Sequence, residues 1–185
     1  MKALEPWRTV IGVVNAEGYY DPETLASEIH ALHCLQEGGE ELSDRPVDYQ
    51  LLPEIDKFRK GFVTDSLREY LHLYFDHELG PHRIDTNANW VPRGQGLFPH
   101  IHRSSHFSCV FYPEPTKFGL SFFDPRALAC RGYPSEFVKN HFRAQNISPK
   151  AGDMVIFPSY LQHSVSYVQE DLRLTLLNEF TLEVD

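Results

Sequence analysis

The first amphipathic pattern of the chain lies in "DPETLASEIHALHCLQEGG" and predicts a helix. Asp21 is a suitable capping residue, Pro22 fits the first helical turn, and Gly38-Gly39 marks the end. The apolar residues recur at the spacing of one helix face: Leu25, Ile29 and Leu32. We therefore expect a helix that buries this face against the rest of the chain.

A second helix is predicted in "TDSLREYLHLYFDHELGP". Ser66 and Glu69 have the spacing of a capping box, and Gly80-Pro81 marks the end. The apolar stripe consists of Leu67, Tyr70, Leu71 and Tyr74. The stretch "EELSDRPVDYQ" between the two helices is polar and predicts a loop.

After residue 83 the pattern changes to short runs of β-branched and aromatic residues separated by Gly and Pro, which predicts strands. The predicted strands are Ile84–Val91, Pro99–His102, Phe107–Tyr112, Leu120–Phe123, Asp153–Phe157, Ser164–Tyr167 and Leu172–Leu182. A short helix is expected in "SEFVKNHF", and Thr9–Val14 is expected to join the sheet as a further strand. These patterns indicate an α+β chain, mainly β, in which helices cover one face of a sandwich or barrel.

The length of 185 residues fits one domain, 1–185, with a helical N-terminal support over 1–83 and a β-barrel core over 84–185. The formal net charge of −9 argues against binding to nucleic acid. No signal peptide or run of membrane-spanning length is found, so we expect a cytoplasmic protein without a membrane contact. Cys34, Cys109 and Cys130 are widely spaced and are expected to be buried free thiols.

Candidate chemistry begins with the stretch "GLFPHIHRSSHF". On a strand, His100 and His102 would point to the same face and begin a metal site. Ten histidines make close pairs frequent by chance, so this pair alone is a weak indication. A further histidine, His163, follows the apolar run "DMVIFPSY".

Arg173 lies ten positions after His163, in the middle of the strongly apolar run "LRLTLLNEF". It shares a strand face with Thr175. A buried guanidinium needs an anionic partner, and Arg binds a carboxylate through two parallel hydrogen bonds. An internal salt bridge or an exposed strand face would explain Arg173 equally well.

Taken together, these residues resemble the double-stranded β-helix, a jelly-roll or cupin-like barrel, of the iron(II)- and 2-oxoglutarate-dependent oxygenases. The segments "HIHRSSHFSCVFY", "FFDPR", "SPKAGDMVIFPSYLQHSV" and "RLTLLNEF" are similar to a group of small oxygenases in this superfamily with an HxH, a distal His and an RxS/T pattern. The resemblance implies an Fe(II)- and 2-oxoglutarate-dependent dioxygenase. It would hydroxylate or otherwise oxidise an unidentified substrate with O2 and release succinate and CO2.

The resemblance also implies roles for individual residues. The metal ligands would be His100, His102 and His163, and Arg173 with Thr175 would hold the far carboxylate of 2-oxoglutarate. Tyr112 would contact this co-substrate. Four further residues are candidates for contacts with substrate or for support of the ligands: Asp124, Arg126, Asn178 and Trp90.

The sequence departs from the usual pattern of the superfamily in one position, because His102 stands where most members have a carboxylate. Three neutral imidazoles also suit Zn or Ni, so the identity of the metal stays open. Asp124 or His106 remains an alternative third ligand.

Two other functions stay open at this point. One is a cupin-like three-His metalloenzyme that does not use 2-oxoglutarate and does not need Arg173. The other is a non-catalytic β-sandwich that binds a partner. An exposed edge strand would also allow a homodimer.

Overall fold

The computed structural model describes residues 8–37, 47–126, 130–170 and 172–183. Its helical segments are α1 (Pro22–Glu37), the short 3-10 turn η1 (Tyr49–Leu51), α3 (Pro53–Phe58), the π-helical turn η2 (Arg59–Val63), α4 (Thr64–Phe75) and α5 (Ser135–His141). Its strands are β1 (Gly12–Asn15), β2 (His82–Pro92), β3 (Leu97–His100), β4 (Phe107–Phe111), β5 (Ser121–Phe122), β6 (Gln145–Asn146), β7 (Asp153–Pro158), β8 (His163–Val165) and β9 (Leu172–Leu182).

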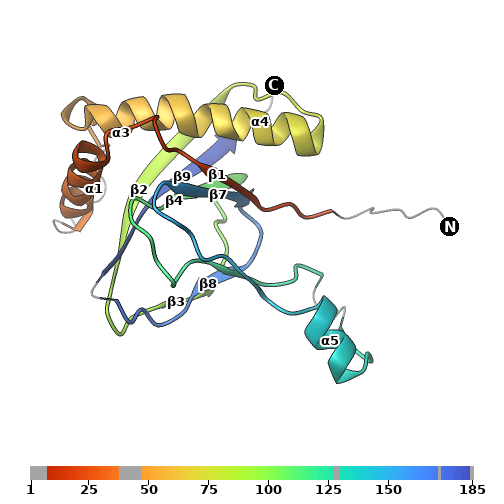
Figure 1. The fold of residues 1–185 in the computed structure, drawn as a ribbon. Helices are drawn as coiled ribbons and strands as arrows, with labels where there is room; N and C mark the ends of the chain where they lie inside the picture. Colours follow the sequence, from red (N-terminus) through yellow and green to blue (C-terminus); the bar gives the residue numbers. More distant parts are fainter. Residues whose placement is uncertain (1–7, 38–46, 127–129, 171, 184–185) are drawn as a thin grey trace.

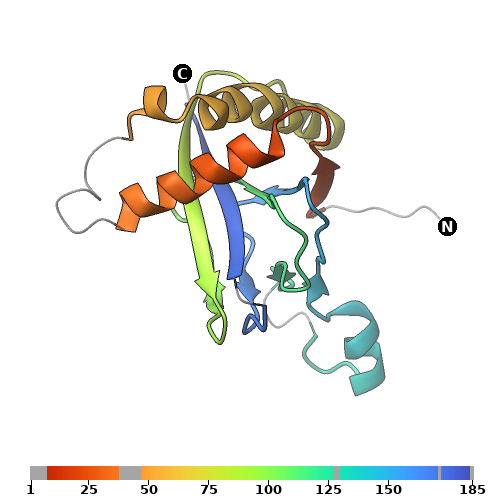
Figure 2. The same ribbon diagram turned by 60° about the vertical axis from the view of Figure 1, so that its left-hand side comes forward.

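The strands form two antiparallel sheets (Figure 1). The larger has the order β1-β7-β4-β9-β2 and the smaller the order β3-β8-β5-β6. The helices α1, α3 and α4 lie along the outer side of the larger sheet, as the turned view in Figure 2 also shows. The predicted α+β barrel with N-terminal helices on one face is confirmed, and the predicted N-terminal strand pairs with β7.

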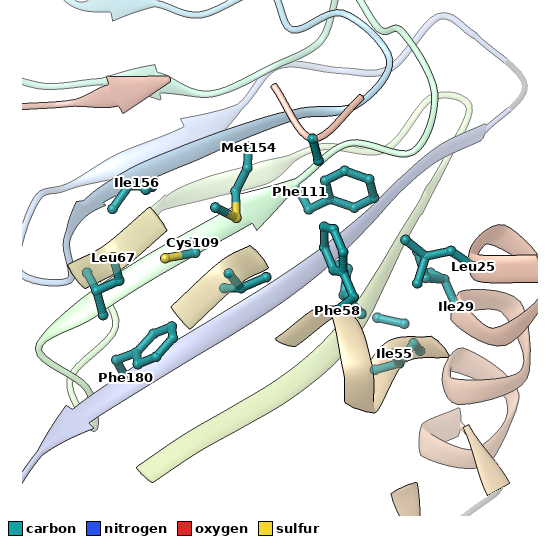
Figure 3. Packing of buried hydrophobic residues seen from close by; sticks show 14 of the residues in the cluster. Leu25, Ile29, Ile55, Phe58, Leu67, Cys109, Phe111, Met154, Ile156 and Phe180 are labelled. Carbon is teal, nitrogen blue, oxygen red and sulfur yellow. The ribbon is translucent and has the colours of Figure 1, made fainter. Parts of the chain in front are cut away.

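Alternation along the central strands divides the buried residues into two cores. On β4, Cys109 and Phe111 point toward the helices, whereas Val110 and Tyr112, just past the strand end, belong to the core inside the barrel. On β7, Met154 joins the first core in the same way. Figure 3 shows this helix-side core, to which α1, α3 and α4 contribute Leu25, Ile29, Ile55, Phe58 and Leu67.

The helices also cover the open edge of β2. Gln36 at the end of α1 accepts a hydrogen bond from the backbone N–H of Ala88 and donates one to the carbonyl of Thr86. The hydroxyl of Tyr49 donates to the same carbonyl, and Arg59 donates to the carbonyl of Ile84. Because these groups occupy backbone positions that a further strand would use, this edge is protected against strand pairing.

Several local predictions need correction. The second predicted helix begins before Ser66, because α4 continues from α3 through the π-helical turn, so Ser66 and Glu69 form no helix start. It ends at Phe75, where Asp76 adopts a left-handed conformation with φ of 50°, and not at Gly80-Pro81. The strands β2, β4, β7 and β9 match their predictions to within two residues at each end, whereas β6 was not predicted.

The cysteine prediction is correct only in part. Cys109 is fully buried and its thiol is free, and burial raises its pKa well above the usual range. Cys34 is exposed and Cys130 is partly exposed, so these two thiols are not part of a core. No helix in the described part of the chain combines the length and the apolar content that a membrane crossing requires.

Candidate metal and anion site

Three histidines converge at one end of the smaller sheet. His100 is the last residue of β3, and it lies opposite His163, the first residue of β8, in the ladder between these strands. His102 follows two residues after β3 ends, and its backbone N–H donates to the carbonyl of Ser159. One ligand atom from each histidine lies within 4.8 Å of the others. The predicted group is therefore assembled, although His102 reaches it from the irregular segment after β3 and not from the predicted strand.

Each of the three imidazoles is oriented by a hydrogen bond at Nδ1. His100 Nδ1 lies 2.8 Å from the carbonyl oxygen of Phe98, and His163 Nδ1 lies 2.9 Å from that of Leu161. Because a carbonyl only accepts, both Nδ1 atoms carry the proton. Their Nε2 atoms are left with free lone pairs, which is the state that a metal requires.

His102 is oriented by a carboxylate instead of a carbonyl. Its Nδ1 lies 3.0 Å from Oε1 of Glu179 on β9, which the sequence analysis did not identify. Its Nε2 lies 3.2 Å from Nε2 of His163. Two imidazole nitrogens bound to one ion at right angles are about 3.0 Å apart, so the observed separation fits a shared metal ion.

The protonation of two of these groups follows from their surroundings. Burial lowers the pKa of His163 to about 4, so its Nε2 lone pair is available at neutral pH. The hydrogen bond from His102 lowers the pKa of Glu179 and outweighs the opposing effect of its burial. Glu179 also accepts a hydrogen bond from the hydroxyl of Ser105 at 3.0 Å. The group is thus a set of nitrogen lone pairs backed by one carboxylate.

Arg173 on β9 lies in the barrel interior and only 2% of its surface is exposed. Its Nε donates to the carbonyl of Phe118 at 2.6 Å, and Nη2 donates to the hydroxyl of Tyr112 at 3.0 Å. Burial raises the pKa of Tyr112, so this hydroxyl is neutral. No carboxylate among the described residues pairs with Arg173, and a buried cation without an anion is costly. The internal salt bridge considered from the sequence is therefore not found there.

Thr175, like Arg173, has hydrogen-bonding capacity that no described residue satisfies. It lies on the same face of β9 as Arg173, it is fully buried, and its hydroxyl makes no hydrogen bond in the structure. A buried hydroxyl is normally satisfied. A carboxylate bound by the free donors of Arg173 and by this hydroxyl would satisfy both residues.

A cavity of about 300 Å³ lies on the side of Phe122 and Leu161, although none of the three histidines lines it. Phe122 and Leu161 line it, and the ring of Phe122 lies 5.8 Å from that of His163. Asp124 and Arg126 also line it and are paired with each other, with Arg126 Nε 2.9 Å from Asp124 Oδ1. This hydrogen bond from Arg126 lowers the pKa of Asp124. The two residues thus lie where a substrate could contact them, and Asp124 does not join the histidines as a ligand.

Three other candidates lie away from the histidines. Asn178 lies on the helix-facing side of β9 and accepts a hydrogen bond from Thr86, so it does not face the barrel interior with Arg173. Trp90 stacks on His33 of α1 at 4.8 Å, also on the outer side of the sheet. His106 accepts a hydrogen bond at Nδ1 from the backbone N–H of Leu182 and is not part of the group. Asn178, Trp90 and His106 therefore lie apart from the three grouped histidines.

Glu179 could have been found from the sequence. It is an acidic residue in an apolar strand, and its distance of six positions from Arg173 places both on the same face. The serines around it, Ser105 and Ser159, carry no such signal, because their contact depends on how β4, β7 and β9 are paired.

Comparisons with known proteins place this geometry in context. A family model described as "Putative 2OG-Fe(II) oxygenase" matches residues 87–177, which include the three histidines and Arg173. None of the curated protein sequences matches the chain significantly.

Solved structures with a similar fold include a prolyl-4-hydroxylase from Pseudomonas putida, with a TM-score of 0.63 and 18% identity over 94% of this chain and 88% of that one. HygX from Streptomyces hygroscopicus, solved with nickel and 2-oxoglutarate, has a TM-score of 0.59 and 14% identity over 94% of this chain and 83% of its own. The epimerase SnoN from nogalamycin biosynthesis, described as non-heme and alpha-ketoglutarate dependent, has a TM-score of 0.61 and 14% identity, with 94% and 78% covered. At these identities the structures support the double-stranded β-helix fold.

Proposed function

Because residues 87–177 belong to a 2OG-Fe(II) oxygenase family, we propose that this chain is an Fe(II)- and 2-oxoglutarate-dependent dioxygenase whose metal ligands are His100, His102 and His163. When bound, Fe(II) and 2-oxoglutarate activate O2 for oxidation of the substrate, with release of succinate and CO2. The substrate is unidentified, and hydroxylation is the reaction that we expect first.

The observation that carries this proposal is the common orientation of the three imidazoles. Each Nδ1 donates its proton to an oxygen, two of them to backbone carbonyls and that of His102 to Glu179. One ligand nitrogen of each histidine lies within 4.8 Å of the others, and since each Nδ1 is bonded to an oxygen, the nitrogen left to bind a metal in the neutral ring is Nε2. The lone pairs of these nitrogens repel one another unless a cation lies between them, so the arrangement fits a metal ion better than a set of core histidines.

The donor set supports a divalent transition metal and leaves a choice among several. Imidazole nitrogens bind iron, nickel and zinc, and no carboxylate among the described residues is placed as a direct ligand in the group. The family favours Fe(II). Zn or Ni would occupy the same three nitrogens without supporting oxidation.

Arg173 and Thr175 support 2-oxoglutarate as the co-substrate. A guanidinium has five N–H donors, of which Arg173 uses one toward Phe118 and one toward Tyr112. The remaining donors and the unpaired hydroxyl of Thr175 would bind the carboxylate of 2-oxoglutarate that lies far from the metal. Tyr112 would orient Arg173 and would not need to touch the co-substrate itself.

This feature also favours the oxygenase over a three-His enzyme that does not use 2-oxoglutarate. Such an enzyme has no use for a cation that is 2% exposed and lacks an anionic partner among the described residues. We further propose that substrate enters through the cavity lined by Phe122 and the pair Asp124 and Arg126.

The test is an anaerobic titration of metal-free protein with Fe(II) and then with 2-oxoglutarate. We expect a visible charge-transfer band from the chelated 2-oxo acid. The band should be lost in His102→Ala and in Arg173→Ala, and retained in His72→Ala, which removes an exposed histidine of α4. Iron binding without the band would favour the enzyme that does not use 2-oxoglutarate, and no iron binding would refute the metal site.

A further inference from the structure

The three histidines differ in what holds them. His100 and His163 donate to backbone carbonyls, which are neutral, whereas His102 donates to the carboxylate of Glu179. Among the described residues, Glu179 is the only carboxylate that pairs with a histidine of this group. Both side chains of the pair are largely buried, at 14% exposed for His102 and 18% for Glu179. At this burial the interaction is weakly screened by solvent.

Glu179 is fixed independently of His102. It lies on β9, an inner strand of the larger sheet, opposite Ser108 of β4. The hydroxyl of Ser105 donates to Glu179 and also lies 2.8 Å from the hydroxyl of Ser159, which in turn lies 2.8 Å from that of Ser108. Apart from His102, the carboxylate is therefore held by Ser105, whose hydroxyl is in turn linked to serines at the end of β7 and on β4. Such support is expected of a group that sets the position of another one.

The charge balance of the proposed metal site explains the position of Glu179 beside His102. The usual ligand set for non-haem Fe(II) contains two imidazoles and one carboxylate, whereas three neutral imidazoles leave the full dication charge uncompensated. A carboxylate bonded to the far nitrogen of a ligand imidazole makes that imidazole a stronger electron donor. It also places a negative charge near the metal without occupying a coordination position.

On this basis, and on the proposed function, we propose that Glu179 is a positioning residue that supplies, through His102, the negative charge which a carboxylate ligand would otherwise bring to the metal. His102 and Glu179 together then take the place of one acidic ligand.

The test compares Glu179→Gln with wild type under anaerobic conditions. The glutamine carbonyl can still accept the Nδ1 proton of His102, so the variant removes the charge and keeps the hydrogen bond. We expect the affinity for Fe(II), measured by competition with a chelator, to fall by about 10- to 100-fold. We also expect the charge-transfer band with 2-oxoglutarate to move to shorter wavelength, because a less electron-rich iron gives up its electrons less readily.

The matched control is Glu28→Gln. Glu28 is a partly buried carboxylate on α1 that accepts hydrogen bonds from the backbone N–H groups of Glu54 and Ile55, away from the histidines. It should leave the metal affinity and the band unchanged. In a His102→Asp background, which places a carboxylate directly on the metal, Glu179→Gln should no longer weaken binding.

An Fe(II) affinity within about twofold of wild type, together with an unmoved band in folded Glu179→Gln, would overturn this inference and leave the proposed function intact. A wild-type protein that binds no Fe(II) would overturn the proposed function itself. If Glu179→Gln does not fold, proton NMR of the zinc-loaded wild-type protein tests the proposal instead. The Nδ1 proton of His102 should resonate further downfield than those of His100 and His163, and three similar shifts would contradict the proposal.

Discussion

Replacement of Arg173 separates its role in binding the co-substrate from its role in the fold. In Arg173→Lys the charge remains but the planar pair of donors is lost. In Arg173→Met both the charge and the donors are lost, while the apolar stem keeps much of its volume. Since Arg173 is 2% exposed, any bound carboxylate would be shielded from water and its hydrogen bonds would count at close to their full strength.

The magnitude follows from the donors that remain free. A hydrogen bond to a charged group contributes about 1.5–3 kcal/mol. A carboxylate held by two such bonds from Arg173 loses about 3 kcal/mol or more in the Met variant, which corresponds to an increase of about 150-fold in the Kd for 2-oxoglutarate. The Lys variant keeps one bond and should lose about 1.5 kcal/mol, or about tenfold.

The assay is the anaerobic titration of Fe(II)-loaded protein with 2-oxoglutarate, followed by the charge-transfer band. The affinity for Fe(II) should stay the same in both variants, because Arg173 is not among the grouped histidines. Arg83→Met is the control, since Arg83 is exposed and paired with Asp85, and it should bind 2-oxoglutarate like wild type. Wild-type affinity for 2-oxoglutarate in a folded Arg173→Met protein would refute the assignment.

Three further predictions concern stability and ligand linkage. Phe111→Ala removes a fully buried ring 4.7 Å from that of Phe58 and should lower the free energy of unfolding in urea by about 3–5 kcal/mol; a loss below about 1 kcal/mol would contradict the packing. Gly119→Ala would place a Cβ 1.9 Å from the carbonyl oxygen of Ile147 and displace the neighbouring carbonyl of Phe118, to which Arg173 donates. We expect the free energy of unfolding to fall by about 1–3 kcal/mol and the binding of 2-oxoglutarate to weaken in the same titration. An unchanged free energy of unfolding and an unchanged affinity would disprove the close contact. Zn(II) at 100 times its Kd should stabilise the protein by about 2.7 kcal/mol in thermal unfolding, and an equal increase in His163→Ala would show that the metal binds elsewhere.

The long strands and the faces of their residues follow directly from the sequence pattern. Alternation along β9 correctly assigned Arg173 and Thr175 to one face, and in the structure Asn178 lies on the other. This works because a strand buried on both sides keeps a strict period of two, and a wrong register would bury the wrong residues. His100 and His163, which the resemblance grouped as metal ligands, lie opposite each other on paired strands in the structure.

What could not be predicted depends on contacts between segments. Helix α4 begins earlier than expected because α3 continues into it through a π-helical turn containing Gly61, a residue that reads locally as a helix breaker. The pairing of Glu179 with His102 depends on where β9 lies relative to the turn after β3, which no local pattern records. Asp124, in the segment "FFDPR", was the carboxylate considered as an alternative third ligand, but it is paired with Arg126.

Strand β9 carries both Arg173, the proposed anion-binding residue, and, six residues further, Glu179, the carboxylate paired with the proposed metal ligand His102. Hydrogen bonds to β2 hold the strand along its whole length, and hydrogen bonds to β4 hold Leu176 to Phe180 on the other side. This pairing keeps the backbone positions of Arg173 and Glu179 about 20 Å apart. Mutations in the loops around the cavity would leave the positions of Arg173 and Glu179 unchanged. On the proposed function, the residues that set the metal and the co-substrate thus lie on a strand that is paired along its length, whereas cavity residues such as Asp124 and Arg126 lie outside the regular strands, where sequence changes are better tolerated.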